Sequence, residues 1–332
     1  MDASNDSKAV EGDSQLLIND EVESVFNLLN NATLLFIITF CGVVFNVINI
    51  IVFIKMGFSD SVNMSLLGLS VADLWASAIL LVCSVCNNPV HAHQYGVIGV
   101  FLGWPHITMV RVSSWLTVFI TFERYLCVAF PLKVKSIITP SRTRSFIIIV
   151  FIIFTVASIP PLSGMRLEWV VLDEETNESG LSFYFTPGGK EIENASFTFS
   201  NVSLLSSFPC VIVFTFLIVV KLEEKSKWRK QTSSMAQKDT TSARDTKVVK
   251  MIILISGIFI FCYMPAVTSI AGALAYAEYN ATGRLKNFFI VCWSFVFCLE
   301  ATNATVTMFV YLKMSTKYRS VFLSIFRCSP QE

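Results

Sequence analysis

The sequence contains few charged residues: Asp, Glu, Lys and Arg make up 15% of the 332 positions, whereas hydrophobic residues make up 54%. A soluble domain with so little charge would leave large apolar patches exposed to water. The chain also has only three His, no glycine-rich phosphate loop and no His/Cys metal spacing. These absences predict a membrane protein that is not an enzyme and does not bind nucleic acid.

Seven apolar runs are present, each with the roughly 20 residues needed to cross a bilayer as a helix. They cover residues 32–54, 64–86, 98–122, 145–164, 202–220, 249–274 and 287–312. We therefore expect an all-α membrane protein with an extracellular glycosylated tail in 1–31, a seven-transmembrane helix bundle in 32–312 and a cytoplasmic end in 313–332. Because residues 1–31 lack a basic segment before an apolar one, we expect no cleavable signal peptide.

The Lys and Arg residues indicate how the chain is oriented. Most of them lie on one side of the predicted spans, with a dense group between residues 221 and 250. Short cytoplasmic segments retain such residues, so the amino terminus is predicted to be extracellular and the protein to be a multi-pass protein of the plasma membrane. Six Asn-x-Ser/Thr sites on the opposite side agree with this orientation, at Asn5, Asn31, Asn177, Asn194, Asn201 and Asn280.

A charged triplet, Glu123-Arg124-Tyr125, ends the third apolar run. An arginine at the edge of the hydrocarbon is costly unless it snorkels to the interface, pairs with a carboxylate or faces water, so it is read first as functional. At 100° per residue, several residues share its face of the helix. These are His106, Val110, Ser113 and Thr117. The stripe predicts a path from the outer mouth of a bundle to the cytoplasm.

Other runs carry matching motifs. The set comprises Asn46 in the first run, Leu69 to Asp73 in the second, Pro131 after the triplet, Pro209 in the fifth, F-I-F-C-Y-M-P from Phe259 to Pro265 in the sixth, and T-M-F-V-Y from Thr307 to Tyr311 in the seventh. Together with the triplet, this set resembles the rhodopsin-like, or class A, family of G protein-coupled receptors. The departures from the family pattern resemble those of invertebrate (molluscan-type) chemosensory or neuropeptide receptors.

The resemblance implies that an extracellular peptide or small chemosensory molecule activates a heterotrimeric G protein by opening the cytoplasmic side of the bundle. It places Glu123, Arg124, Tyr125 and Asp245 in a cytoplasmic ionic lock. It places an activation relay at Asn46, Asp73, Phe259, Tyr263, Pro265 and Tyr311. It suggests a ligand pocket at His106, Val110, Arg111, Tyr263, Phe297 and Glu300.

A sodium ion is the one cofactor that the resemblance suggests, at Asp73, Ser113, Asn303 and Thr307, because a hard cation needs clustered oxygen atoms. Arg111 and Glu300 are unusual intramembrane charges. Either they pair, or one of them meets a charged group of the ligand. Arg111 lies about 140° from Arg124 on the helix, in the direction of the fourth and fifth helices.

Several family features are replaced or missing. Tyr263 stands in place of a Trp, Thr307-Met308 in place of Asn-Pro, and Leu217 in place of a Tyr. Without that proline, the seventh helix should keep its backbone hydrogen bonds. Gly99 stands where a disulfide cysteine is expected, and residues 163–200 contain no Cys.

Two smaller elements are also expected. In the second outer loop, L-S-F-Y-F and E-I-E-N-A-S-F-T-F flank a Pro-Gly-Gly turn, which predicts a β-hairpin over residues 181–199. After Tyr311, L-K-M-S-T-K-Y-R-S-V-F-L-S-I-F predicts a short amphipathic eighth helix on membrane lipid, followed by a palmitoylated Cys328.

The alternative function is that of a seven-span transporter or a ligand-gated channel. Such a protein would need repeated halves, or helices broken by Gly and Pro around a polar lining. The sequence shows no such repeat. Within the receptor interpretation, His106 occupies the position where amine receptors carry an Asp, and Ala301 has no neighbouring Lys for a retinal Schiff base. Amine and retinal ligands are therefore not expected.

Overall fold

The computed structural model describes residues 17–88, 92–173, 178–232 and 240–326. Within these ranges the chain forms seven long helices. They are α3 (Leu35–Met56), α4 (Ser61–Cys86), α5 (Ala92–Ala129), α7 (Pro140–Ser163), α8 (Gly189–Thr232), α9 (Thr240–Ala275) and α10 (Lys286–Met314). Shorter elements are α2 (Asp20–Asn27), the π-helix η1 (Leu28–Leu34), α6 (Val134–Ile137), α11 (Thr316–Phe326) and the strands β1 (Met165–Asp173) and β2 (Glu178–Phe185). The predicted fold class is confirmed.

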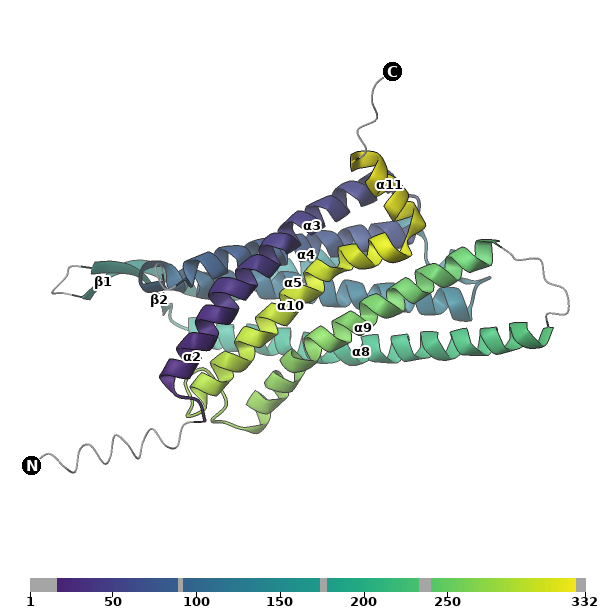
Figure 1. The fold of residues 1–332 in the computed structure, drawn as a ribbon. Coiled ribbons are helices and arrows are strands. Elements are labelled where there is room, and N and C mark those ends of the chain that lie inside the picture. Colours follow the sequence, from purple (N-terminus) through teal and green to yellow (C-terminus); the bar gives the residue numbers. More distant parts are fainter. Residues whose placement is uncertain (1–16, 89–91, 174–177, 233–239, 327–332) are drawn as a thin grey trace, which may run out of the picture.

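The long helices form a closed bundle (Figure 1). Neighbours in sequence pack together, and α10 returns to contact α3. The helix α5 lies at the centre, where it contacts α4, α7, α8 and α9. Figure 1 shows the hairpin β1–β2 and α2 at one end of the bundle, and α11 with the far ends of α8 and α9 at the other. The two ends therefore differ in structure, as the sequence predicts.

Six helical segments of the described chain are long and apolar enough to cross a membrane, with α2, η1 and α3 counted as one. The remaining long helix is α5. Its centre is surrounded by other helices, so polar side chains can face protein there rather than lipid. Buried Thr108, Ser113, Ser114 and Thr117 lower its apolar content. The composition of α5 thus reflects its central position.

The helix α10 runs from Lys286 to Met314 without interruption. Met308 occupies the position at which the family pattern has a proline, so its backbone N–H remains available to the helix. The continuous backbone predicted for the seventh helix is confirmed. A further difference from the sequence prediction is length, because α5, α8 and α9 extend beyond the apolar runs at their ends.

A hairpin exists between α7 and α8, but the predicted pairing was wrong. Residues 181–185 belong to β2, and their partner is β1, with Met165 opposite Phe185 and Trp169 opposite Leu181. The predicted second arm is instead the start of α8. The Pro-Gly-Gly sequence ends β2 and opens α8: Gly188 has φ +77°, and the N–H of Gly189 donates to the carbonyl of Thr186 at 2.7 Å.

Helical spacing explains this outcome. Phe197, Ser200 and Leu204 lie on one face of α8, where Phe197 meets the Trp104 ring of α5 and Leu204 is buried. A strand over the same residues would place alternate side chains in the bundle and lose these contacts. The sequence 165–173, rich in Val, Leu and Trp, supplies the strand instead.

In the described part of the chain, the end of the bundle that carries the hairpin is held without a disulfide. Among the described cysteines all are free, in agreement with the missing cysteine pair. The α2–η1 segment packs on α10 instead: the amide of Asn30 donates to the Ser294 hydroxyl at 2.8 Å, and the amide of Asn287 donates to Asp20 at 2.8 Å. Phe26 and Phe295 add a ring contact at 5.6 Å between centroids.

The predicted eighth helix is present as α11. Its Tyr318 is fully buried against Phe53 of α3 and Tyr311 of α10. The Lys317 ammonium donates to the carbonyl of Met56 at 3.2 Å. One face of α11 is therefore packed on the bundle, and the helix closes its end beside α3. Cys328 lies outside the described residues.

Candidate functional site

A line of polar side chains follows the inner face of α5. His106, Ser113, Thr117 and Arg124 are all buried, and Val110 between them is buried too. The stripe predicted from the 100° spacing is therefore confirmed. Because α5 is the central helix, each of these residues faces another helix of the bundle. The line extends along most of the length of the bundle.

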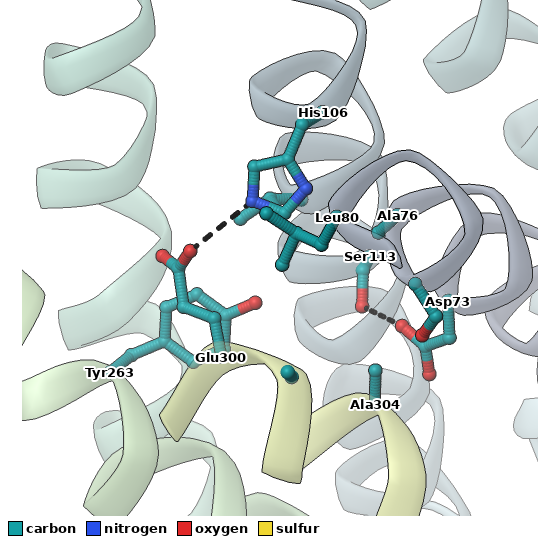
Figure 2. Close-up of a pocket in the computed structure, with 11 residues that line it drawn as sticks. Asp73, Ala76, Leu80, His106, Ser113, Tyr263, Glu300 and Ala304 are labelled. Carbon is teal, nitrogen blue, oxygen red and sulfur yellow. Dashed lines mark hydrogen bonds and ion pairs between the residues drawn. The ribbon is translucent and has the colours of Figure 1, made fainter. Parts of the chain in front are cut away.

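The upper part of this line borders a pocket, shown in Figure 2. Its walls come from α4, α5, α9 and α10 and comprise Asp73, Ala76, Ser77, Leu80, His106, Val110, Ser113, Tyr263, Glu300, Ala301 and Ala304. His106 and Glu300 point toward each other across the pocket, with 3.5 Å between Nε2 and Oε2 (Figure 2). Both side chains are buried, so this contact lies away from bulk water.

Aromatic rings surround this pair. Tyr263 is buried and stacks on Phe259 one turn below, with 4.4 Å between ring centroids. The Phe297 ring packs against the rings of His106 and Trp293, with 6.2 Å and 5.8 Å between ring centroids, respectively. His106, Val110, Tyr263 and Glu300 therefore border one pocket, as predicted. Phe297 contacts the His106 ring but does not line the pocket.

Arg111 and Glu300 do not form an ion pair with each other in the described part of the chain. Glu300 meets His106, whereas Arg111 Nε donates to the Ser200 hydroxyl of α8 at 2.9 Å. The helical angle predicted that Arg111 lies toward the fourth and fifth helices, and Ser200 belongs to the fifth long helix of the bundle. The sequence allowed either a direct Arg111–Glu300 pair or a charge left for the ligand. In the described part of the chain, the direct pair does not form.

Asp73 and Ser113 meet at the lower end of the pocket, where the serine hydroxyl donates to Asp73 Oδ1 at 2.8 Å (Figure 2). Asn303 and Thr307 are also buried, but neither lines the pocket. The Thr307 hydroxyl points to the carbonyl of Ala304 at 3.5 Å. A carboxylate beside a hydroxyl is a donor set of the kind that a hard cation binds. Only two of the four predicted sodium residues are brought together directly.

Below the pocket, α3 and α10 are joined by side-chain amides. Asn46 donates to the carbonyl of Ala304 at 2.9 Å and accepts from Asn49 at 3.2 Å. Asn49 in turn accepts from the Tyr318 hydroxyl at 2.6 Å. Tyr311, predicted in the relay, is buried against Tyr318. The sequence analysis missed Asn49 and Tyr318; the i, i+3 spacing of Asn46 and Asn49 was the available signal.

The charged triplet lies near the carboxyl end of α5. Arg124 Nη2 is 3.0 Å from Glu123 Oε1, and the Ser61 hydroxyl of α4 donates to the same carboxylate oxygen. Tyr125 is half-buried beside Phe214 of α8. The local half of the predicted lock is thus present. Asp245 falls within α9, but its side chain lies outside the described residues.

The predicted glycosylation sites differ in exposure. Asn194 is exposed near the start of α8, whereas Asn31, Asn201 and Asn280 are half-buried. Asn31 also lies inside η1, where its amide donates to Asn27 at 2.6 Å. Asn5 and Asn177 lie outside the described residues. Asn194 is therefore the described site whose side chain is open to modification.

A closed bundle of seven long helices, with a buried polar line from a pocket at one end to an Arg–Glu pair at the other, defines a multi-pass membrane protein of the receptor type. The family model described as "7 transmembrane receptor (rhodopsin family)" matches residues 44–311. The chain belongs to this family.

Individual relatives are distant. The chain is 24% identical to adenosine receptor A2b of Gallus gallus over 219 residues, which is 62% of each protein. It is 22% identical to a probable G-protein coupled receptor of Caenorhabditis elegans over 297 residues, or 86% of this chain and 67% of the relative. It is 23% identical to neuropeptide receptor 22 of the same organism over 291 residues, or 83% and 64%. The matches thus span about two thirds of the length of these relatives.

Proposed function

We propose that this protein is a receptor that binds an extracellular ligand and activates a heterotrimeric G protein. The observation that carries the proposal is the buried polar line on α5, which joins the pocket at His106 to the Arg124–Glu123 pair. A ligand that binds the open bundle more tightly than the closed one shifts the population toward the open form. No catalytic step is part of this function.

The proposed signal passes through the side-chain contacts described above. A ligand at His106 and Glu300 displaces Tyr263, and the stacked Phe259 moves with it. Both aromatic residues belong to α9, so the helix rotates or tilts about Pro265, where a backbone hydrogen bond is missing. Movement of α9 opens the cytoplasmic end around Arg124, where the G protein binds.

The proposed placement is the plasma membrane with the amino terminus outside. The hairpin, α2 and the exposed Asn194 then lie on the extracellular side, and α11 lies on the inner leaflet, where its outward face meets membrane lipid. Cys328 follows α11 closely enough to be palmitoylated there. The ligand is a peptide or a small chemosensory molecule. The similarity to a neuropeptide receptor supports the peptide.

Nucleotide exchange tests the proposed function. The full chain is expressed with each class of heterotrimeric G protein, and GTP exchange is measured with synthetic neuropeptide and small-molecule libraries. We expect at least one library to accelerate exchange on one G protein, and Arg124→Ala to remove that acceleration at equal surface expression. Transport of a library compound, with no exchange on any G protein, would instead support a transporter.

Sodium binding at Asp73 gives a further prediction. If sodium occupies the Asp73–Ser113 site, replacing NaCl by N-methylglucamine chloride should lower the melting temperature of the purified wild-type protein. A site at ten times its Kd contributes about 1.4 kcal/mol, or roughly 3 °C. Asp73→Asn should remove this difference, because the amide carries no charge. The matched control is Ser77→Ala, in the same pocket wall. Equal wild-type melting in both salts would show that the site is not used.

A further inference from the structure

Arg111 is a buried cation that forms no ion pair within the described residues. It is 5% exposed, its Nε donates to Ser200, and its Nη1 is buried with no hydrogen-bond partner. No carboxylate of the described chain lies within ion-pair distance of it. A guanidinium stays protonated in proteins and carries five N–H donors in a planar fork. Burying such a charge without a partner reduces the stability of the empty fold.

Neighbouring groups do not supply the missing anion. Glu300 acts on Arg111 electrostatically, but from beyond ion-pair distance, and its closest partner is His106. Ser203, one turn below Ser200 on α8, already accepts a hydrogen bond from the indole N–H of Trp115 at 2.8 Å. Ser200 therefore takes only Nε of Arg111, and Nη1 is left without an acceptor within the described residues.

We propose that Arg111 binds the carboxylate of the extracellular ligand. This inference rests on the proposed function and names the chemical class of its ligand, an acid with an apolar body. A guanidinium can hold a carboxylate through two parallel N–H···O bonds. Arg111 itself does not line the pocket, but its chain neighbour Val110 does, and so does Tyr263, which interacts with Arg111 electrostatically, so an apolar body can lie on that side. Exposed acids such as Glu168 and Glu191 do not oppose this binding strongly, because solvent screens them within about 8 Å.

A carboxylate can come from the free carboxyl terminus of a peptide or from a small organic acid. The test therefore uses N-acetylphenylalanine for the first and 4-phenylbutyrate for the second, each beside its neutral amide. Thermal unfolding of the purified full chain is followed in lipid nanodiscs, with gluconate, a carboxylate that has no apolar body, as the only other anion added. We expect one of the acids to raise the melting temperature of the wild type and its amide to have no effect.

The arginine variants separate ligand binding from a structural role. Arg111→Gln should weaken the effect of the acid by about tenfold or more, and Arg111→Lys should retain part of it. In the absence of acid, Arg111→Gln should melt at or above the wild-type temperature, because it removes an unpaired buried charge. A structural arginine predicts the opposite sign, so an empty variant that melts lower or does not fold overturns the proposal.

Two controls complete the experiment. Arg166→Gln removes an exposed arginine that donates to the carbonyl groups of Ser163 and Met165, and it should leave the response to the acid unchanged. Chloride in place of gluconate tests whether a simple ion is the partner. An Arg111-dependent shift with chloride alone, or no shift with either acid, refutes the carboxylate site. The GTP exchange measurement can still succeed in that case, so the two proposals fail separately.

Discussion

Glu123→Ala is expected to raise ligand-independent signalling on the order of tenfold. Glu123 is 1% exposed and holds Arg124 at 3.0 Å, with the Ser61 hydroxyl on the same carboxylate. Removing one member of a buried ion pair costs about 3–5 kcal/mol in the conformation that buries it. If only about 1.4 kcal/mol of this cost is relieved when the cytoplasmic end opens, the open population rises tenfold.

Basal GTP exchange at equal surface expression measures this effect. Ser61→Ala is the matched control, because it removes the hydrogen bond from α4 but keeps the charge pair, so its basal increase should be much smaller. Adding Arg124→Ala to the Glu123→Ala variant should abolish the increase. If Glu123→Ala signals at the wild-type basal level, the pair does not hold the closed state, and the lock must lie elsewhere.

The polar line on α5 was predictable because it depends on one helix alone. Helical geometry fixes which residues share a face, and the high energy of polar groups in hydrocarbon fixes which way that face points. His106, Ser113 and Arg124 are therefore buried as expected. The same reasoning correctly directed Arg111 toward the helix that carries Ser200.

Partners on different helices were harder to predict. Spacing within α10 places Glu300 on its inner face, but the depth at which α10 sits beside α5 decides whether it meets His106 or Arg111. That depth depends on packing of the whole bundle, such as the contact of Asn46 with the Ala304 carbonyl. The pairing of His106 with Glu300 is therefore information that the structure adds.

The hairpin shows how local patterns can mislead. Residues 190–199 alternate well enough for a strand, yet they also carry the helical spacing that places Phe197 against Trp104. Such short segments satisfy both periods, and tertiary contacts decide between them. The strand β1 was missed although Met165 to Trp169 alternate between apolar and charged residues, and this alternation was the available signal.

The missing outer disulfide and the missing seventh-helix proline place structural demands on other contacts. At the end that carries the hairpin, α2 and η1 bind α10 through the Asn30–Ser294 and Asn287–Asp20 hydrogen bonds. At the opposite end, α10 is continuous and its Tyr311 packs against Tyr318 of α11. Both ends of α10 are therefore fixed by noncovalent contacts with terminal segments of the chain.

We accordingly expect Tyr318→Ala to destabilise the protein strongly. The ring is fully buried between Phe53 and Tyr311 and also contacts Phe322, and its hydroxyl donates to Asn49 at 2.6 Å. Truncating a buried aromatic side chain costs about 3–5 kcal/mol, and Asn49 loses a hydrogen-bond donor as well. The purified protein should melt roughly 10 °C lower.

Tyr318→Phe separates the ring from the hydroxyl. It keeps the three aromatic contacts and removes only the bond to Asn49, so it should cost about 1 kcal/mol. A melting temperature for Tyr318→Ala equal to that of the wild type would show that α11 contributes nothing to the closed bundle. Because the Tyr318 ring packs against Tyr311 near the end of α10, loss of that ring should also free this end of the helix. Basal GTP exchange should then rise in Tyr318→Ala but not in Tyr318→Phe.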